Sequence, residues 1–421
     1  MKRRDFLWLA GAATAAGSLA GLPSGAAGAG KARVVVVGGG FGGATAAKYL
    51  RLWDPAIEVT LVERTDIFTS CPMSNLVLAG FTRMDDIRRS YDGLRRHGVQ
   101  VVNDEVTAVD ADRKRVRLLR GGALIYDRLV IAPGIDFRFG EIEGYEAAMQ
   151  AGRVLHAWKA GAQTVELRRQ LEQMRDGGVF AISVPMTPFR CPPGPYERAS
   201  LVADYFKRAK PRAKVLVLDA NPDVASKPGL FKAAWREYYA GMLEYRPNST
   251  AIGVDAAAMT LKLEVEDVKA DVLNVVPPQR AGDIARKAGL ITTSQHWCDV
   301  DWRTMESKAL PGVHLLGDAT LAAPAMPKSA SMANNHAKIA AAAIVEILSG
   351  RPPVPVQILS TCYSFVSRTE AVHVASVHAW SDADRTLKTV PGSGGVSPAR
   401  SEAEGTLAWH WARTIWADSF G

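Results

Sequence analysis

The sequence lacks several features that would define its class at once. Only four of its 421 residues are cysteine, and no two of them form a Cys-x-x-Cys pair. This spacing excludes a zinc ribbon and a thioredoxin-type redox motif. The net charge is +8, but there is no long block of lysine and arginine, so nucleic acid is not an expected partner. A basic surface that meets an acidic protein, or simply a solvated one, stays open.

The sequence also lacks, beyond its first 30 residues, an uninterrupted apolar run of about 20 residues, the length that spans a bilayer. We therefore expect no integral membrane segment. Residues 1–29 have a basic start, an apolar middle and a small-residue end, the pattern of a secretory signal peptide. Arg3-Arg4 followed by Phe6-Leu7 indicates the twin-arginine export pathway, with an ordinary Sec signal as the alternative. The expected location is the periplasm, where disulfides persist.

The composition, 48% hydrophobic and 22% charged, is that of a globular protein with two or three domains. Near its start an apolar strand leads into a G-x-G-x-x-G turn at Gly38, Gly40 and Gly43, followed by an Ala-rich helix and a strand ending at Glu63. This order and spacing predict a dinucleotide-binding Rossmann domain. The carboxylate of Glu63 can accept hydrogen bonds from ribose hydroxyls and would repel a 2′-phosphate, which favours FAD or NAD over NADP.

A second segment, far along the chain, favours FAD over NAD. Residues 312–319 read GVHLLGDA, a strand that ends in Gly317-Asp318, the place of an acid near the ribityl and pyrophosphate groups in FAD domains. An Ala-rich helix follows and can direct its positive N-terminal dipole at the flavin ring. Lys328, just before that helix, is predicted near the pyrimidine edge of the flavin, where it would stabilise the reduced form.

Between these segments we expect a second α/β unit with helices at 161–176 and 197–209 and a strand at 178–184. It has the position of an NADH domain, but the turn after its strand reads MTPFRCPPGPYE and keeps only Gly194. Proline has no backbone N–H, so this turn is a poor cradle for phosphate. We infer that the nicotinamide site is lost and that the electrons come from another donor.

The predicted domain organisation follows from these segments. After the signal peptide, 30–145 and 276–350 form a discontinuous FAD-binding domain, 146–275 the second domain, and 351–421 a C-terminal interface domain. The last of these is expected to be a small α+β unit that ends in a helix with three tryptophans in eight residues. Such a cluster packs in a core, meets another protein or lies on a membrane surface.

Four short motifs, RCPPGPYERAS, SCPMSN, AMPKSA and TCYSF, carry a resemblance. Together they resemble the flavin-binding subunit of flavocytochrome c sulfide dehydrogenase, over about residues 31–421. The resemblance implies a glutathione-reductase-like α/β flavoprotein with two dinucleotide-binding domains and a small C-terminal α+β domain. It also implies that the protein oxidises sulfide in the periplasm and passes electrons to a c-type cytochrome subunit, commonly a dihaem one.

The resemblance assigns roles to three of the cysteines. FAD would be attached covalently, as an 8α-S-cysteinyl flavin, through Cys71, although Ser70 stands where the family motif has threonine. A buried free thiol is the alternative. Cys191 and Cys362 would form the redox disulfide, with a structural staple as the alternative. Cys298 is left over and is expected to be inert.

The mechanism implied is a disulfide exchange. Hydrosulfide would attack one sulfur of the Cys191–Cys362 pair, leaving a persulfide on one cysteine and a thiolate on the other. Glu197, at the start of a predicted helix, is the candidate base, with a surface acid at a helix N-terminus as the alternative. Two other functions stay open: a sulfide:quinone oxidoreductase, and a non-catalytic flavin electron-relay subunit of a sulfur-oxidation system.

Overall fold

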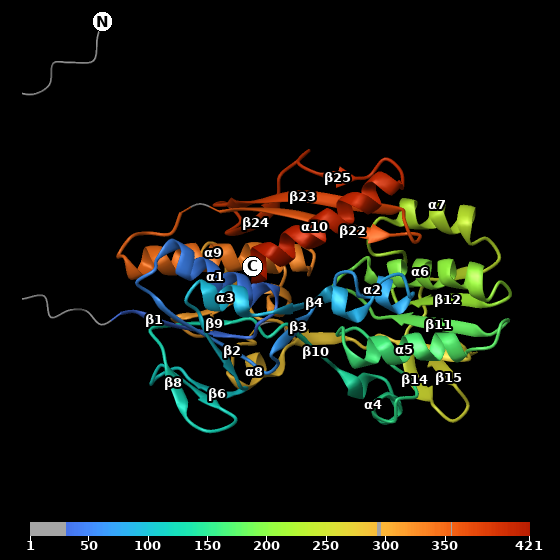
Figure 1. The fold of residues 1–421 in the computed structure, drawn as a ribbon, viewed down its shortest axis with the longest axis horizontal. Coiled ribbons are helices and arrows are strands. Elements are labelled where there is room, and N and C mark those ends of the chain that lie inside the picture. The colour runs from blue at the N-terminus through green and yellow to red at the C-terminus, as the bar shows by residue number, and fades with distance from the viewer. Residues whose placement is uncertain (1–30, 293–295, 355) are drawn as a thin grey trace, which may run out of the picture. The chain divides into compact units, whose positions relative to one another are not determined.

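A computed structural model describes residues 31–292, 296–354 and 356–421 (Figure 1). The predicted signal peptide lies outside these residues. The chain is a mixed α/β protein, as the sequence predicts, and Ala32–Gly421 form one unit of contacting elements. Within the described part no helix is long and apolar enough to cross a membrane.

The first domain is built on a seven-stranded sheet with the order β19-β20-β21-β9-β1-β2-β5. Its centre is β1, a run of four valines of which every one is buried, as expected for a strand with parallel neighbours on both sides. The strands are β1 (Arg33–Val37), β2 (Glu58–Glu63), β5 (Gln100–Asn103), β9 (Arg128–Ile131), β19 (Val300–Asp301), β20 (Glu306–Ser307) and β21 (Val313–Leu315). Four strands of this sheet thus precede the second domain in the sequence, and three follow it.

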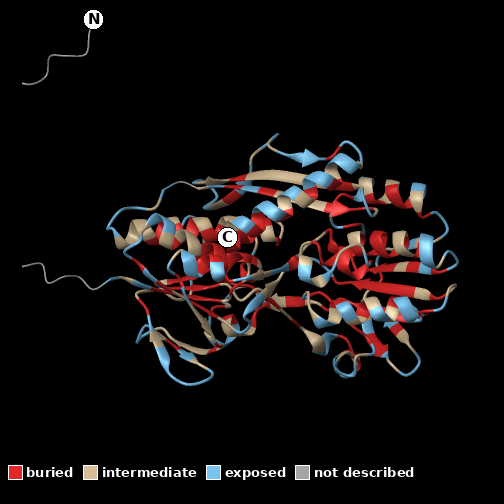
Figure 2. Cartoon of the chain, viewed as in Figure 1, coloured by how far each residue is buried: buried red, intermediate tan, exposed pale blue. Residues whose placement is uncertain are grey.

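Two helices of this domain, α1 (Phe41–Trp53) and α9 (Ala330–Leu348), pack closely against each other. Small residues permit the approach: a Cβ on Gly42 would lie only 3.3 Å from Leu316 and 3.6 Å from the carbonyl of Ala333. Ser329 caps α9, where its hydroxyl accepts from the backbone N–H of Met332. Figure 2 shows this packed layer as mostly buried.

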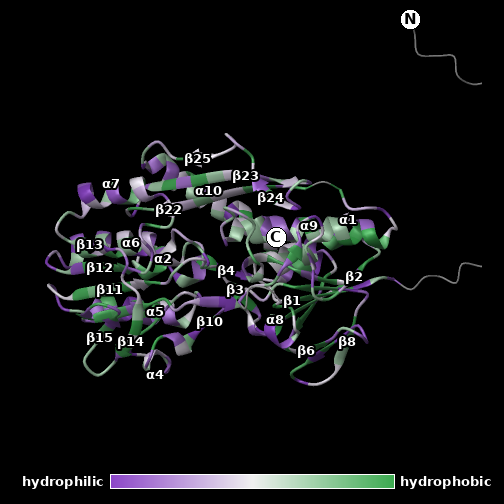
Figure 3. Cartoon of the chain, turned by 180° about the vertical axis from the view of Figure 1, so that it is seen from behind, coloured by the Kyte–Doolittle hydropathy of each residue, from purple (hydrophilic) through white to green (hydrophobic). Residues whose placement is uncertain are grey.

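The second domain has a four-stranded parallel sheet in the order β13-β12-β11-β17, with α5 and α6 on opposite faces (Figure 1). Its elements are β11 (Val179–Val184), β12 (Lys214–Asp219), β13 (Leu243–Arg246), β17 (Val272–Val275), α5 (Ala162–Gln173), α6 (Gly194–Ala209) and α7 (Pro228–Tyr238). Hydrophobic residues concentrate in the strands of this sheet and of the first (Figure 3).

Helix α6 begins at Gly194, three residues before the helix that the sequence predicts. Pro193 is its N-cap and Pro195 lies in its first turn, where proline is tolerated because those N–H groups have no partner within the helix. The prolines therefore start the helix instead of extending the turn. Helix α5 ends at Gln173, before the predicted residue 176, because the chain becomes extended at Met174.

The C-terminal region has a sheet of β22 (Gln357–Phe365), β23 (Ala371–Ser381), β24 (Thr386–Thr389) and β25 (Gly395–Val396), covered by α10 (Glu402–Phe420). Helix α10 also packs on α1 of the first domain. One of its tryptophans, Trp416, is 3% exposed and donates from Nε1 to the hydroxyl of Ser70 at 3.0 Å. That tryptophan is part of the core, whereas Trp409 and Trp411 are partly exposed.

The remaining elements are short. They are β3 (Ile67–Thr69), β4 (Arg88–Ser90), β6 (Val106–Asp110), β7 (Arg115–Leu118), β8 (Ala123–Ile125), β10 (Ile135–Phe137), β14 (Ala251–Asp255), β15 (Thr260–Leu263), β16 (Asp267–Lys269), β18 (Gln279–Ala281), α2 (Ser74–Leu78), α3 (Asp92–Arg96), α4 (Tyr145–Gln150), α8 (Asp283–Lys287) and the 3₁₀ turns Met84–Ile87, Phe139–Glu141 and Gly317–Ala319.

Candidate flavin and thiol site

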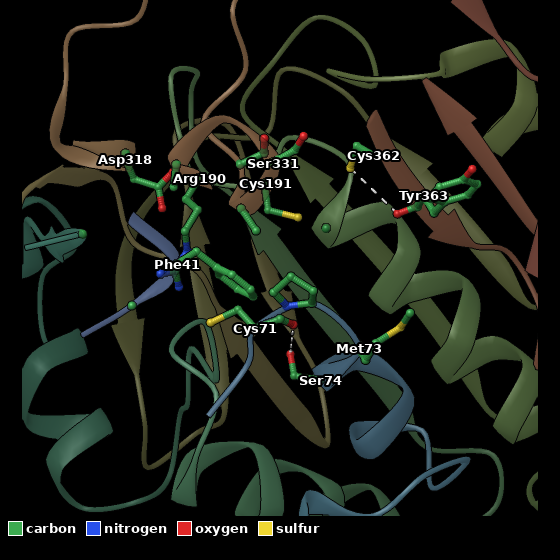
Figure 4. Close-up of a pocket in the computed structure, with 18 of the residues that line it drawn as sticks. Phe41, Cys71, Met73, Ser74, Arg190, Cys191, Asp318, Ser331, Cys362 and Tyr363 are labelled. Carbon is green, nitrogen blue, oxygen red and sulfur yellow. Dashed lines mark hydrogen bonds between the residues drawn. The ribbon is translucent and has the colours of Figure 1, made fainter. Parts of the chain in front are cut away.

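One pocket is lined by residues from all three regions of the chain (Figure 4). Cys71 comes from the first domain, Cys191 and Glu197 from the second, and Cys362 from the C-terminal region. The pocket is continuous with a groove that runs along the glycine turn to Glu63, since several residues line both. Segments far apart in sequence therefore meet at a single elongated site.

The glycine turn after β1 has the geometry of a phosphate cradle. Gly38 has φ +95°, and a Cβ there would lie 2.4 Å from the carbonyl oxygen of Ala132. A Cβ on Gly43 would lie 1.8 Å from the carbonyl oxygen of Gly38. At Gly40, by contrast, a Cβ would meet only Phe68 at 3.9 Å, so the backbone is open to a ligand. The first turn of α1 carries no acidic residue, which leaves its N–H groups available to an anion.

Two acids lie at the ends of this cradle. Glu63 accepts from the backbone N–H of Gly39 at 2.6 Å and from that of Arg64 at 2.8 Å, so it braces the turn while lining the groove. Asp318 lines the pocket, and its Oδ1 is buried with no hydrogen-bond partner among the described residues. Burial raises the pKa of Asp318. The unsatisfied carboxyl oxygen fits the hydroxyl groups of a flavin dinucleotide, which can donate to it, and the N–H groups of the open glycine turn fit its phosphates.

Lys328 is not among the residues that line this pocket, and its predicted place near the flavin stays a prediction. Its side chain is 5% exposed, and its Nζ donates to the carbonyls of Asp318, at 3.0 Å, and of Thr320. It also lies 3.7 Å above the ring of Trp297. Burial lowers the pKa of Lys328 to about 8. Only its backbone reaches the thiols, because its carbonyl accepts from the N–H of Cys191 at 2.8 Å.

Cys71 lies in the turn between β3 and α2, at the junction of the pocket and the groove. The N–H and hydroxyl of Ser74 hold this turn by donating to the carbonyl of Cys71, at 3.0 and 2.7 Å. Its Sγ lies 3.7 Å from the carbonyl oxygen of Trp158, which also accepts from Arg190. The thiol is therefore held at the wall of the predicted flavin site.

Cys191 and Cys362 are both free thiols in the structure, as are Cys71 and Cys298. The predicted disulfide stays a prediction. Burial raises the pKa of Cys191 well above its ordinary value, with further increases from Cys362 and Glu197. Burial also raises the pKa of Cys362. Cys298 is fully buried, which raises its pKa to about 12.

Gly194 has a local structural reason to be glycine. Cys191 adopts φ +57°, and its carbonyl accepts from the N–H of Gly194 at 2.8 Å, which closes a tight turn. A Cβ on Gly194 would lie 2.8 Å from the ring of Trp158 and 3.0 Å from the Sγ of Cys191. The one glycine kept in this turn therefore makes room for the thiol and the indole.

Glu197 belongs to a hydrogen-bond network. Its carboxylate accepts from the N–H of Phe365 at 2.8 Å and from Nδ2 of Asn75 at 2.7 Å. Asn75 in turn accepts from Nε of Arg198 at 3.0 Å. Burial raises the pKa of Glu197, although these hydrogen bonds oppose the rise. The acid therefore keeps its proton at higher pH than an ordinary glutamate while it contacts all three regions of the chain.

Sequence reasoning missed three polar residues near the thiols. Asn75 is in the quoted SCPMSN motif and Arg198 in RCPPGPYERAS, but neither has a pattern that predicts its partners. Arg198 is 2% exposed and donates to Asn75, Asn274 and the carbonyls of His156 and Ala157. The third, Lys227, has no sequence signal at all.

The second domain keeps an acid where a nucleotide domain would bind ribose, but it is already engaged. Asp219 ends β12 and is fully buried. Its Oδ2 accepts from the hydroxyls of Tyr196 at 2.7 Å and Tyr245 at 3.1 Å, and its Oδ1 accepts from Asn221. Together with the prolines of the preceding turn, this arrangement fits the inferred loss of the nicotinamide site.

Comparison with known proteins gives three matches to family models. Residues 32–171 match a pyridine nucleotide-disulphide oxidoreductase domain, 164–277 the central domain of the sulfide dehydrogenase [flavocytochrome c] flavoprotein chain, and 354–420 the flavin-binding domain of flavocytochrome c sulphide dehydrogenase. A 48-residue flavoprotein chain of sulfide dehydrogenase [flavocytochrome c] from Chlorobaculum thiosulfatiphilum is 67% identical over its whole length, which is 11% of this chain.

More distant relatives are sulfide:quinone oxidoreductases. The mitochondrial enzyme of Mus musculus is 27% identical over 300 residues, 68% of this chain and 65% of that protein. This chain therefore spans just under two thirds of the length of that relative. The solved sulfide:quinone oxidoreductase of Aquifex aeolicus superposes with a TM-score of 0.77 at 18% identity, over 92% of this chain and 91% of that one. At that identity the likeness shows the shared fold.

The fold and the elongated pocket define a flavoprotein reductase with two dinucleotide-type domains, as the sequence predicts. Within that class, the chain belongs to the flavocytochrome c sulfide dehydrogenase flavoprotein family.

Proposed function

We propose that this protein oxidises hydrosulfide to zero-valent sulfur or polysulfide in the periplasm, through the Cys191–Cys362 pair and FAD, and passes the electrons to a c-type cytochrome. The observation that carries the proposal is the meeting of Cys191, Cys362 and Glu197 in a pocket continuous with the glycine turn. The membership of the family supports the substrate and the partner. The twin-arginine pattern at Arg3-Arg4 supports the location.

The proposed chemistry balances over two hydrosulfide ions. The first attacks one sulfur of the disulfide, so that a new S–S bond forms, the old one breaks and the other cysteine leaves as a thiolate. The second removes the bound sulfur as hydrogen disulfide and leaves a second thiolate. The two thiolates then re-form their bond and release two electrons. FAD supplies the acceptor for this electron pair and the means to pass electrons singly to a haem.

Glu197 is the proposed base for hydrogen sulfide entering the pocket. Its carboxylate lines the same pocket as both thiols and is held by Asn75 and Phe365, which fixes the direction of its free lone pairs. A raised pKa suits a base that works near neutral pH, because proton transfer is most effective when the pKa is close to the operating pH.

We also propose that Cys71 holds FAD covalently. The support is its place at the wall of the groove, where the turn fixed by Ser74 presents the thiol. Acid-precipitated protein is expected to stay yellow, and the variant C71A to release all of its colour into the supernatant. Colourless precipitate from the wild type would contradict the attachment.

The acceptor is the part of the proposal that a direct assay decides. Purified full-length protein is mixed with sulfide and either a c-type cytochrome or a short-chain quinone, and reduction is followed spectroscopically. Faster cytochrome reduction supports the proposal. Faster quinone reduction would make the protein a sulfide:quinone oxidoreductase, the function of its mouse relative. Normal flavin content without turnover on either acceptor would indicate an electron-relay subunit.

A further inference from the structure

A buried lysine of the second domain reaches the strand that carries Cys362. Lys227 is 5% exposed, and its Nζ donates to the hydroxyl of Ser364 at 3.1 Å and to the carbonyl of Cys362 at 3.4 Å. Both acceptors are neutral. Within the described residues Lys227 forms no ion pair with a carboxylate, so its charge is only partly compensated by these contacts.

The backbone at this position is also unusual. Lys227 is the N-cap of α7 and has φ +57°, in the left-handed region that a side chain other than glycine adopts rarely. Pro228 follows and disfavours the right-handed helical conformation for the residue before it. Burying an ammonium group without a counter-charge is unfavourable. Two unfavourable features therefore coincide at a residue that contacts the proposed thiol centre.

Three groups near Lys227 can carry a negative charge, namely two thiols and one carboxyl group. Cys362 lies on β22, Cys191 precedes α6, and Glu197 lies in the first turn of α6. The charge of Lys227 lowers the pKa of all three groups, although burial raises each of them more. For Cys362 this lysine is the largest influence that opposes burial.

Cys191 has different neighbours. The thiol of Cys362 and the carboxyl of Glu197 both raise its pKa more than Arg190 and Lys227 lower it. The other buried cation, Arg198, is already engaged by two asparagine side chains and two carbonyls. The two thiols thus differ in their charged neighbours, and the ammonium of Lys227 directly contacts the backbone of Cys362.

We propose that Lys227 is a positioning residue that holds β22 at Cys362 and places the negative charge of the reduced pair on Cys362. In turnover, which rests on the proposed function, hydrosulfide would then bond to Cys191. The electron pair of the broken disulfide would go to Cys362, which leaves as the stabilised thiolate. A thiol with a lower pKa is the better leaving group in such exchanges.

The test measures thiol ionisation directly. Full-length protein with its bound flavin is reduced, treated briefly with iodoacetamide across a pH series, and the alkylation of each cysteine is quantified by mass spectrometry of its peptide. In the wild type, Cys362 is expected to react with a lower pH midpoint than Cys191. In K227M the midpoint of Cys362 should rise by about one pH unit, a tenfold slower reaction below it.

Three further variants keep the test decisive. K227R should restore the wild-type order, because it keeps the charge, and S364A should shift the Cys362 midpoint in the same direction by less, even if K227M fails to fold. K232M, a partly exposed lysine of the same helix that pairs with Asp223, should leave both midpoints unchanged.

An unchanged Cys362 midpoint in K227M or S364A, or a lower midpoint for Cys191 than for Cys362 in the wild type, would overturn the assignment. Because the readout needs no sulfide, an ordered alkylation in a protein without sulfide turnover would leave this inference standing and remove the proposed function.

Discussion

The turns that follow β1 and β11 come after a strand with parallel neighbours on both sides, each in its own sheet, and each leads into a helix. After β1 three glycines leave the backbone open to a ligand at Gly40. After β11 three prolines surround Cys191 and Gly194, and the acid at the end of the next strand, Asp219, is bound by two tyrosines. The turn after β1 therefore presents main-chain N–H groups to a ligand, and the turn after β11 presents a thiol and a carboxyl group.

The first prediction tests whether the second turn is a chemical site. C191S and C362S should each lower sulfide-dependent cytochrome c reduction on the order of 10³-fold or more, because a serine hydroxyl can neither form nor break the disulfide. Flavin content should stay at the wild-type level, as the glycine turn is untouched. Cys298 provides the control, and C298S should keep activity. Retained turnover in C191S would reduce the pair to a structural role.

The second prediction concerns the acid in the same turn. E197Q should lower turnover at neutral pH by roughly 10²–10⁴-fold, the usual contribution of a general base. Since the pKa of Glu197 is raised, the wild-type rate should fall with decreasing pH at a value above the ordinary 4.5 of a glutamate. E197Q should lack that acidic limb in the pH–rate profile. The matched variant E166Q, at a surface ion pair, should keep it.

The third prediction sharpens the role of the first turn. G43A introduces a Cβ 1.8 Å from the carbonyl oxygen of Gly38, so the turn and α1 must separate. We expect a loss of about 3 kcal/mol in the free energy of unfolding and a lower flavin-to-protein ratio. G229A, in α7 with open space around its Cβ, is the control and should be neutral or stabilising. Equal unfolding midpoints for the two variants would argue against the cradle.

The fourth prediction, with the smallest expected effect, concerns the titration of Lys328. Its pKa is about 8 when folded against 10.5 in the unfolded chain, so between these values the folded protein binds fewer protons. The free energy of unfolding should therefore rise with pH across this window, by up to about 1.4 kcal/mol per pH unit. K328M should lack this gain in denaturant titrations at pH 8 and 10. Parallel curves for the two proteins would show that Lys328 does not titrate there.

The sequence predicts best the features that depend on residue spacing within one short segment. The glycine turn, the valine strand and the Ala-rich helices follow from spacing alone, and the motif resemblance led to the thiols. The sequence predicts poorly the side-chain positions that depend on contacts between distant regions of the chain. The partners of the Lys328 ammonium, which are the ring of Trp297 and two carbonyls, have no sequence signal. The hydrogen-bond partners of Asn75 and Lys227 lie in other regions of the chain, so they cannot be predicted from local sequence.

The pocket joins pieces of three regions, and this has a consequence for the stability of the whole chain. Cys191 and Cys362 are 171 residues apart, so a bond between them would close a large covalent loop across a domain boundary. By chain entropy a loop of that size restricts the unfolded ensemble by about 5 kcal/mol. The proposed catalytic bond is thus also a removable cross-link, and each turnover would briefly loosen the anchorage of the C-terminal sheet on the second domain. Heat resistance and redox state would then vary together in this protein.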